Sequence, residues 1–486
     1  MNIPTTDHYL LKHAHVPRPL LGHQAAQFPV AEGLAAFDNL VLVDLEIRGG
    51  AIAAIQSSTQ PSIRLSSAAS SLPSAETSSR VPPVASPPLP TVDLRRGMVW
   101  SRFVDMHTHL DKGHIWGRSP NPDGTFATAF HTILRDRERH WDSEDIYRRM
   151  EFGIKCSVAH GTGALRTHID AYNNQANISF GAFKALQEEW QDRITLQAAS
   201  LVSLDYFLGP QGETLADLVA LVGGVLGGVA FPNPDLDAQL DRVFALAQER
   251  DLSLDFHVDE SGDPADDALE RVALTALRYN FTKQIVCGHC CSLALQPHDR
   301  AQRTIQRVKE AGIGIVSLPM CNLYLQDRNQ VATGRQYRGA TAADTTQQQD
   351  AAPTHTPRWR GVTLLHELHH AGVPVAIASD NCRDPFYPFG DHDMLEVFRE
   401  GVRIAHLDSP YADWSQVVTT TPALLIGLPQ AGRIEVGCPA DLVLFQARSF
   451  SELLARSQHD RTVLHRGRPI DTTLPDYAEL DSLLVP

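Results

Sequence analysis

Between residues 100 and 430 the sequence alternates short β-branched or apolar runs with longer amphipathic segments, and this alternation restricts the fold more than any other feature. The candidate strands are residues 102–107, 162–168, 194–200, 227–232, 252–258, 285–289, 312–318 and 373–379. Helix-like segments follow most of them, as in residues 237–249, where Leu240, Val243 and Phe244 share one face. Strands that alternate with helices pair in parallel, because each crossover requires a helix. Eight such units predict an α/β fold, a (β/α)8 TIM barrel; a doubly wound sheet is the alternative, but no glycine-rich phosphate loop follows the first strand.

The two ends of the chain predict a smaller β domain beside the barrel. Residues 39–55 look like two strands around a Gly-Gly turn, and residues 432–445 repeat that character near the other end. Strands from the two ends can therefore pair with each other. We expect residues 1–98 and 430–486 to form a small β-sandwich domain, and residues 99–429 to form the barrel.

Two stretches look like insertions because they contain few large apolar residues. Residues 56–92 are dominated by Ser, Pro, Ala and Thr, and residues 326–357 are rich in Gln, Thr, Asp and Arg. Such segments cannot bury enough apolar surface to offset the entropy that is lost on ordering. We expect the first to be a flexible loop of the small domain, and the second to be a loop inserted in the barrel after its seventh strand.

The composition excludes several classes of protein. The 486 residues carry a formal net charge of -15, 43% are hydrophobic and 20% are charged, which is typical of a globular protein. An acidic chain repels phosphate backbones, so general nucleic-acid binding is not expected. No apolar run reaches the ~18 residues of a membrane span, and no signal peptide is visible at the amino terminus. Seven cysteines without an export signal indicate reduced thiols and a cytoplasmic protein.

Polar side chains follow several of the expected strands at their carboxyl ends, where barrel enzymes carry their reactive groups. The first strand ends in His-Thr-His, and alternation places His107 and His109 on the same side. The fifth strand ends at His257, the sixth at His289, and Asp380 follows the eighth. Imidazoles and a carboxylate at one mouth are suitable ligands for Zn²⁺ or Fe²⁺. Each residue alone is a weak signal, and it is their common placement at strand ends that predicts a metal site.

These segments resemble the amidohydrolase superfamily, and within it the cytosine deaminase branch. The matching segments are Phe-Val-Asp-Met-His-Thr-His-Leu-Asp-Lys at 103–112, Arg-Thr-His-Ile-Asp at 166–170, His-Val-Asp-Glu at 257–260, Gly-His at 288–289 and Ser-Asp-Asn-Cys-Arg-Asp-Pro-Phe-Tyr-Pro at 379–388. The resemblance extends over about residues 38–55 and 95–445, apart from the second insertion. It implies a barrel with a small β domain, in agreement with the strand pattern.

The resemblance also implies a set of roles. Four side chains would hold one metal ion: His107, His109, His257 and Asp380. Glu260 would shuttle protons, His289 would lie beside the metal-bound water, and Asp380 would also accept a proton from that water. A bound metal lowers the pKa of water from ~16 toward ~7, so the implied reaction is attack of hydroxide on the amino-bearing carbon of an N-heterocycle, with release of ammonia. Cytosine or a close pyrimidine analogue is the expected substrate.

The metal count follows from the fourth strand. Two-metal members of the superfamily typically bridge their ions with a carboxylated Lys at the end of that strand, whereas here it ends in Val-Ala-Phe-Pro at 229–232. We therefore expect one divalent ion, Zn²⁺ or Fe²⁺. His168 and Asp170, at the end of the second strand, are expected to support the metal ligands through hydrogen bonds.

Four further residues are candidates for binding the substrate. The amide of Gln197 offers a donor and an acceptor together, which suits a pyrimidinone edge, although a buried structural Gln is an equally good interpretation. Phe386 stands where bacterial cytosine deaminases carry Trp, and Asn381 stands where they carry a second Asp. Lys112 is either a pocket cation or a solvated loop residue. These departures leave the identity of the heterocycle open.

Other interpretations remain to be tested. Residues 366–370, His-Glu-Leu-His-His, match the zincin pattern of a metalloprotease, but the barrel places them on its last outer helix. Cys287 and Cys290 form a single Cys-x-x-Cys without the second pair that a structural zinc would need. A triazine, creatinine-like or isocytosine-like substrate, hydrolysis of a cyclic amide, and a non-catalytic homologue are further alternatives. The expected partners are a small heterocyclic amine and further copies of the chain in a homo-oligomer, with no nucleic acid and no membrane.

Overall fold

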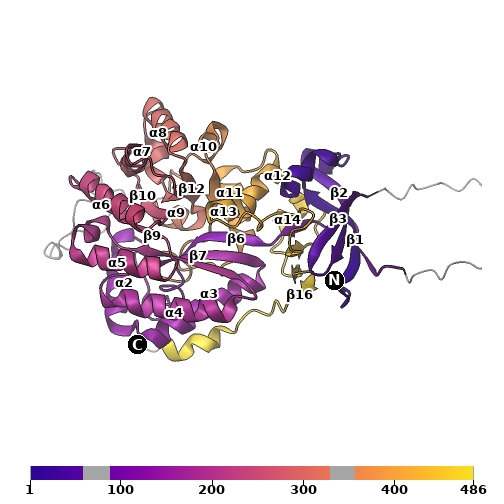
Figure 1. The fold of residues 1–486 in the computed structure, drawn as a ribbon, viewed down its shortest axis with the longest axis horizontal. Helices are drawn as coiled ribbons and strands as arrows, with labels where there is room; N and C mark the ends of the chain where they lie inside the picture. The colour runs from indigo at the N-terminus through magenta and orange to yellow at the C-terminus, as the bar shows by residue number, and fades with distance from the viewer. Residues whose placement is uncertain (1, 59–87, 329–355, 485–486) are drawn as a thin grey trace, which may run out of the picture.

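The computed structural model describes residues 2–58, 88–328 and 356–484. Its larger part is a barrel of parallel strands surrounded by helices (Figure 1). The strands are β6 (Phe103–Thr108), β7 (Thr162–Asp170), β8 (Thr195–Leu201), β9 (Leu226–Ala230), β10 (Leu254–Val258), β11 (Ile285–His289), β12 (Gly314–Ser317) and β13 (Val375–Ile377). They pair in chain order, and bridges between Ala199 and Val225 and between Thr108 and Asp380 close the barrel. The predicted TIM barrel is therefore confirmed.

The outer layer consists of helices that alternate with these strands. They are α2 (Phe126–His140), α3 (Ser143–Ala159), α4 (Asn174–Trp190), α5 (Pro210–Leu221), α6 (Leu236–Glu249), α7 (Ala268–Arg278), α8 (His298–Glu310), α10 (Leu365–Ala371) and α11 (Met394–Ala405). Leu240, Val243 and Phe244 of α6 are fully buried, as the amphipathic pattern predicted. The helices thus cover the barrel with one apolar face each, as their sequence periodicity requires.

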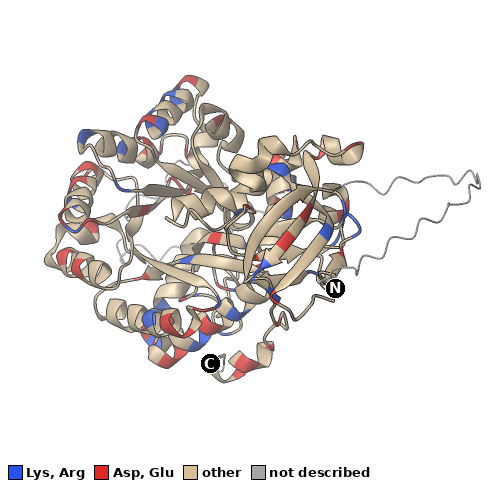
Figure 2. Ribbon diagram, turned by 45° about the vertical axis from the view of Figure 1, so that its right-hand side comes forward, with Lys and Arg blue, Asp and Glu red and all other residues tan. Residues whose placement is uncertain are grey.

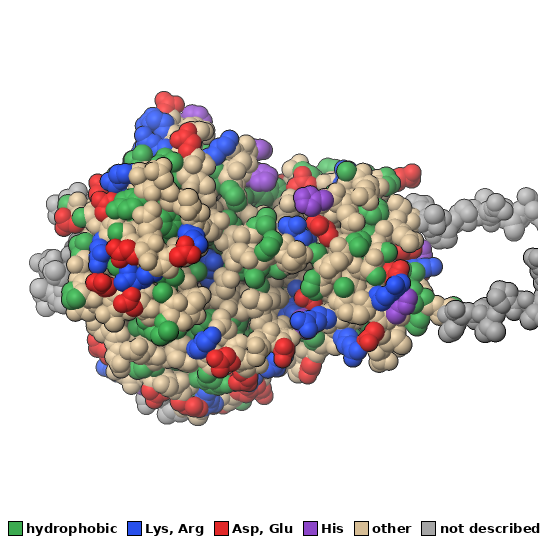
Figure 3. Space-filling view, viewed as in Figure 1, with side chains coloured by type: hydrophobic (Ala, Val, Ile, Leu, Met, Phe, Trp, Pro, Cys, Tyr) green, Lys and Arg blue, Asp and Glu red, His purple; other side chains and the backbone are tan. Residues whose placement is uncertain are grey.

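Charged residues of both signs are mixed over the outer helices (Figure 2). Ion pairs join neighbouring helices, as between Arg250, directly after α6, and Asp217 of α5 at 2.7 Å, and between Arg271 of α7 and Asp237 of α6 at 2.7 Å. On the face shown in Figure 3, hydrophobic side chains occur in small groups among charged and polar ones. In the part of the chain that the structure describes, no helix combines the length and the hydropathy needed to span a bilayer.

One end of the barrel is filled by apolar side chains. They come from the strands and from α13 (Thr420–Leu425) with the residue after it: Val104, Met106, Ala164, Val286, Val316, Leu318, Ala376, Ala378, Ala423, Leu425 and Ile426. Leu425 lies against Gly314, the first residue of β12, where an added Cβ would be 2.3 Å from Leu425 Cδ2. Helix α13 therefore closes the end at which the strands begin, and the opposite end is left for a functional site.

The remaining strands form two four-stranded sheets beside the barrel, at the right of Figure 1. One contains β1 (His8–Pro17), β2 (Leu40–Arg48), β3 (Ala51–Ser57) and β4 (Thr91–Asp93), and the other contains β5 (Val99–Ser101), β14 (Leu442–Leu444), β15 (Thr462–His465) and β16 (Arg468–Pro469). The two strands predicted around the Gly-Gly turn are β2 and β3. The interpretation of residues 432–445 was too broad, since only Leu442–Leu444 is a strand, and it pairs with β5 and β15.

The two expected insertions fall largely outside the described residues. Strand β3 runs to Ser57 and β4 begins at Thr91, so both edges of the expected 56–92 loop are strand. Residues 59–87 and 329–355 are not described. The division of the chain into a small β domain and a barrel domain at the expected boundaries stays a prediction.

Candidate metal centre and active site

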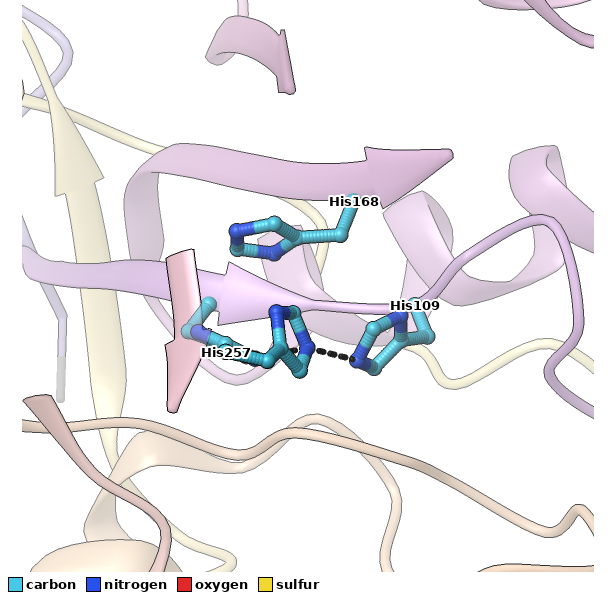
Figure 4. A group of neighbouring side chains, drawn as sticks. His109, His168 and His257 are labelled. Atoms are coloured by element: carbon cyan, nitrogen blue, oxygen red, sulfur yellow. Dashed lines mark hydrogen bonds between the residues drawn. The ribbon is translucent and has the colours of Figure 1, made fainter. Parts of the chain in front are cut away.

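Four side chains converge at the carboxyl end of the barrel. His107 is in β6, His109 follows it by two residues, His257 is in β10, and Asp380 follows β13. His257 Nε2 lies 3.1 Å from His107 Nε2 and 3.3 Å from His109 Nε2, and Asp380 Oδ1 lies 3.2 Å from His109 Nε2 and 3.6 Å from His107 Nε2. Figure 4 shows His109 and His257 turned toward each other, with His168 beside them. Ligand atoms with metal bonds of about 2.0–2.2 Å lie roughly 3–3.5 Å apart, so these spacings are compatible with a shared ion. Two overlapping groups have all their ligand atoms within 4.8 Å of one another: His107, His109, His168 and His257, and His107, His289 and Asp380.

Several buried polar atoms of this group have no hydrogen bond. Both oxygens of Asp380 and the Nδ1 atoms of His107, His109 and His257 are buried without a hydrogen bond among the described residues. Burial lowers the pKa of each of these imidazoles well below its usual value, and neighbouring histidines lower it further. Their lone pairs are therefore free at neutral pH. A buried carboxylate whose close neighbours are neutral imidazoles is costly without a cation, so the chemistry of the group fits a divalent metal.

The ligands are positioned by their surroundings. Ser379 donates to Asp105 through its backbone N–H at 3.1 Å and its hydroxyl at 2.5 Å, which fixes the residue before Asp380. His168 Nε2 lies 3.1 Å from Asp255 Oδ1, and its ring centroid is 4.0 Å from that of His107. The His168 ring therefore lies against His107, but neither of its nitrogens makes a hydrogen bond among the described residues, so the expected support of the ligands through hydrogen bonds stays a prediction.

Gly288 on β11 provides the space for His107. A Cβ at this position would lie 2.8 Å from Cε1 and 3.2 Å from Nδ1 of the His107 ring. We expect Gly288→Ala to displace this imidazole and to weaken metal binding by about 10–100-fold, the range seen when a ligand loses its orientation. Metal content after dialysis and kcat/KM measure the effect. Gly181→Ala on α4, where nothing lies within 4 Å, is the matched control and should change neither; full metal occupancy in Gly288→Ala would refute this account of the glycine.

A second polar group lies beside the metal ligands. His289 Nδ1 is 3.0 Å from Asn322 Nδ2 and 3.3 Å from Glu260 Oε1, and Asn322 Nδ2 also donates to Glu260 Oε1 at 3.3 Å. Because an amide nitrogen only donates, His289 Nδ1 accepts, and the ring proton is assigned to Nε2. That nitrogen is buried without a partner. Burial lowers the pKa of His289 to about 4, so the ring is neutral.

Glu260 is a strong candidate for an acid. Burial raises its pKa well above the usual value, and the charge of Asp380 raises it further. The carboxyl group therefore holds its proton to a higher pH than an exposed glutamate does. Asn322, which fixes it, is missing from the sequence-based prediction because it lies on the short helix α9 (Pro319–Leu325), after a strand whose end carries no titratable group. The sequence could have indicated Asn322 only through its position shortly after the seventh strand, at the carboxyl end of the barrel.

A cavity opens from the metal ligands toward α2. It encloses about 700 Å³ of empty space, including its open mouth. Its apolar walls comprise Phe126, Phe130, Ile133, Leu134, Leu201, Val202, Val229, Phe231 and Phe386. The polar lining includes Lys112, Arg137, Asp170, Glu260 and Asn381. The structure thus brings three of the four expected substrate-binding residues, Lys112, Asn381 and Phe386, to one cavity with the metal ligands.

Each of the polar wall residues is held by a neighbour. Lys112 Nζ donates to Asp170 Oδ1 at 2.7 Å and lies 5.9 Å from the ring centroid of Phe386. Arg137 on α2 approaches the same carboxylate, at 3.7 Å from Asp170 Oδ2. Asn381 Nδ2 donates to Asp384 Oδ2 at 2.6 Å. Asp170 therefore orients two cations at the wall, a more direct role at the cavity than the support of metal ligands expected from the sequence.

Gln197 does not reach this cavity. Its Nε2 donates to the Ile426 carbonyl at 2.8 Å, and its Oε1 accepts from Arg166 at 3.1 Å and 3.3 Å. Both ends of the amide are therefore used near the apolar end of the barrel, next to α13. Of the two interpretations of Gln197, the contacts favour a structural role and not binding of the substrate. The sequence placed it in the correct strand but could not give its depth.

The zincin-like motif also lies away from the centre. His366 on α10 faces the Ala405 carbonyl at 2.9 Å from Nε2, and the rings of His366 and His369 pack near Trp414 at centroid distances of 4.8 Å and 4.9 Å. No residue of this motif belongs to a group of possible metal ligands within the described ranges. Cys287 and Cys290 are buried free thiols outside such groups as well.

Comparison with known proteins relates this site to a family. A sequence profile of the amidohydrolase family matches residues 151–470. A pterin deaminase from Rhizobium rhizogenes (strain K84 / ATCC BAA-868) is 51% identical over 399 residues, which cover 82% of this chain and 86% of that protein. An N-isopropylammelide isopropyl amidohydrolase from Pseudomonas sp. (strain ADP) is 23% identical over 394 residues, 78% of this chain and 87% of that protein. Among solved structures, a 5-methylcytosine deaminase from Klebsiella pneumoniae has a TM-score of 0.71 at 22% identity, covering 96% of this chain and 98% of that one.

Proposed function

Because the chain belongs to the amidohydrolase family, we propose that it is a metal-dependent deaminase that replaces the exocyclic amino group of a pterin by oxygen and releases ammonia. The relatives support a deaminase acting on a nitrogen heterocycle. The 51% identity to a pterin deaminase favours a pterin over cytosine, the substrate expected from the sequence, since the 5-methylcytosine deaminase shares only the fold at 22% identity. The convergence of His107, His109, His257 and Asp380 beside the partly buried Glu260 is the observation that carries the proposal.

The metal would be held by the four convergent side chains, and one ion suffices. No lysine stands at the end of β9, where a bridge to a second ion would begin. A bound divalent ion, Zn²⁺ or Fe²⁺, supplies the charge that lets a water molecule lose a proton near neutral pH. The identity of the ion follows from metal analysis of the purified protein.

The surrounding residues divide the proton transfers. Glu260 gives its proton to the ring nitrogen next to the amino-bearing carbon, which makes that carbon more electrophilic. Asp380 accepts a proton from the water whose oxygen adds to the carbon, and passes it to the amino group. The carbon–nitrogen bond then breaks, ammonia leaves, and the proton of the added hydroxyl group returns to Glu260, which restores its acid form. His289 donates from Nε2 to the added oxygen, and the Asn322 amide holds Glu260 and His289 in register for these steps.

The cavity walls suit a flat bicyclic ring. Phe126 and Phe386 pack edge to face at a centroid distance of 5.2 Å and form one apolar wall. Arg137 and the Lys112–Asp170 pair offer donors and an acceptor along another side. The apolar residues of α2 extend the cavity beyond the part nearest the metal ligands, which gives the second ring of a pterin a place that a single pyrimidine ring would leave unfilled.

Ammonia release from a panel of amino-heterocycles tests this proposal. We expect pterin to be deaminated with a kcat/KM at least about tenfold above that of cytosine, isocytosine or an aminotriazine, because one ring fewer leaves apolar wall uncovered at ~25 cal/mol per Å². The same sample is analysed for metal, so that an empty site is not mistaken for a wrong substrate. A metal-replete protein that releases no ammonia from pterin would exclude it as the substrate, and a preference for cytosine would restore the pyrimidine interpretation.

A further inference from the structure

A second cluster of possible metal ligands lies outside the site described above. It consists of His114, Cys382 and His392, whose ligand atoms all lie within 4.8 Å of one another. The three side chains are 3%, 1% and 2% exposed as whole residues, so the cluster is enclosed by protein. None of them belongs to the proposed catalytic centre, and none lines the large cavity.

The two imidazoles of this cluster have no hydrogen-bonding partner. Nδ1 and Nε2 of both His114 and His392 are buried and unpaired among the described residues. The centroids of the two imidazole rings are 5.7 Å apart, and the His114 ring packs edge to face with Phe152 at a centroid distance of 4.8 Å. Ring packing of this kind does not replace a hydrogen bond to the ring nitrogens. A buried polar group left unsatisfied costs about 1–3 kcal/mol. Burying two unpaired imidazoles beside a thiol therefore destabilises the fold unless a ligand binds to their nitrogen atoms.

The backbone around the cluster is arranged to present these side chains. His114 and His392 both have positive φ, 62° and 54°, in a region that non-glycine residues seldom adopt. The His114 N–H donates to the Cys382 carbonyl at 3.0 Å, which joins the two loops directly at the cluster. Gly153 on α3 leaves space for the His392 ring, since a Cβ there would lie 3.1 Å from His392 Nε2.

We propose that His114, Cys382 and His392 bind a second metal ion, Zn²⁺, in a structural site separate from the catalytic centre. Thiolate sulfur with two imidazole nitrogens is a donor set that zinc prefers, with bonds of about 2.0–2.3 Å. The three ligand atoms already lie within 4.8 Å of one another, and a water molecule would take the fourth position of the tetrahedron.

The position of the cluster indicates what this ion would do. Lys112 and Asn381 line the catalytic cavity, while His114 and Cys382, two residues and one residue further along the same loops, point to the cluster. An ion here would tie together the loop that follows β6 and the loop that follows β13. It would thereby fix the wall that carries Lys112, Asn381 and Phe386, without touching the substrate.

Cobalt substitution distinguishes the two sites, because their donor sets differ. The catalytic ligands are nitrogen and oxygen only, so a thiolate-to-cobalt charge-transfer band in the near ultraviolet can report only on a cysteine. We expect metal-free full-length protein to take up two equivalents of Co²⁺ and to develop this band, and the protein as purified to contain two metal ions per chain. These measurements on the unmodified protein need no variant and no substrate, so their result is independent of the proposed deamination.

Variants then assign the band. Cys382→Ser should lose the band and one equivalent of metal, whereas Cys438→Ser, at a buried cysteine of the small β domain, should keep both. His107→Ala should lose the other equivalent and keep the band. Uptake of one equivalent without a sulfur band by the unmodified protein, or a band that persists in Cys382→Ser, would overturn the proposal.

Discussion

The Glu260→Gln enzyme is expected to retain its metal and to lose turnover by about 10²–10⁴-fold, the usual contribution of a positioned acid or base. The amide fills the same space and can still meet Asn322, but it has no proton to give to the ring nitrogen. Metal analysis and single-turnover ammonia release on the same preparation separate the two effects. Because Glu260 does not bind the metal in this arrangement, kcat should fall while metal content stays constant.

The pH profile provides an independent check on the same residue. Burial raises the pKa of Glu260, so its acid form persists to higher pH than an exposed glutamate would allow. Activity that depends on this acid should fall as pH rises through the raised pKa, giving an alkaline limb. Substitution of Glu213, an exposed glutamate on α5, by Gln serves as a control and should leave both kcat and the limb unchanged. Full activity in Glu260→Gln would remove the role assigned to this carboxyl group.

Asp380→Asn should have the largest effect, because this carboxylate is both a proposed metal ligand and the proposed proton acceptor. We expect metal affinity to fall by more than the roughly 10–100-fold typical of losing an outer partner, and activity to fall below that of the Glu260→Gln enzyme. Asparagine tolerates the positive φ of 65° at this position, so the backbone should be preserved. Equilibrium dialysis against a metal buffer measures the affinity, and circular dichroism checks the fold.

The matched control for the metal measurement is His366→Ala in the zincin-like motif. Its ring packs near Trp414 on the outside of the barrel, so the variant should keep the metal content of the unmodified protein. Metal loss in His366→Ala together with full occupancy in Asp380→Asn would move the metal centre to α10 and refute the arrangement proposed here.

The sequence predicted the scaffold and the convergent residues well, for a physical reason. In a parallel barrel every strand ends at the same mouth, so residues that are distant in the chain, such as His107, His257 and Asp380, are placed together by the repeat alone. The residue whose predicted location differs from the structure is Gln197. Strand alternation gives the direction of a residue but not its height along the barrel, and this amide lies low enough to bond the Ile426 carbonyl.

Other residues escaped prediction because no periodic pattern places them. Asn322 lies on a short helix after β12, and only its tertiary position shows that it bonds both His289 and Glu260. His114 and His392 lie in irregular loops far apart in the chain, and nothing in their local sequence indicates that they meet. Similarly, residues 432–445 read as strand from their apolar content, whereas most of them are irregular and only β14 pairs in a sheet.

The seam between the first and last strands of the barrel lies at the metal centre itself. Strands β6 and β13 are joined by the bridge between Thr108 and Asp380, by the Asp380 N–H donating to the His107 carbonyl at 2.9 Å, and by the bonds of Ser379 to Asp105. An ion bound by His107 and Asp380 would therefore link the first and last strands of the barrel at the point where the barrel closes. Metal binding and closure of the barrel would then be coupled. Unfolding of the metal-free protein would begin with separation of β6 and β13 at the active site.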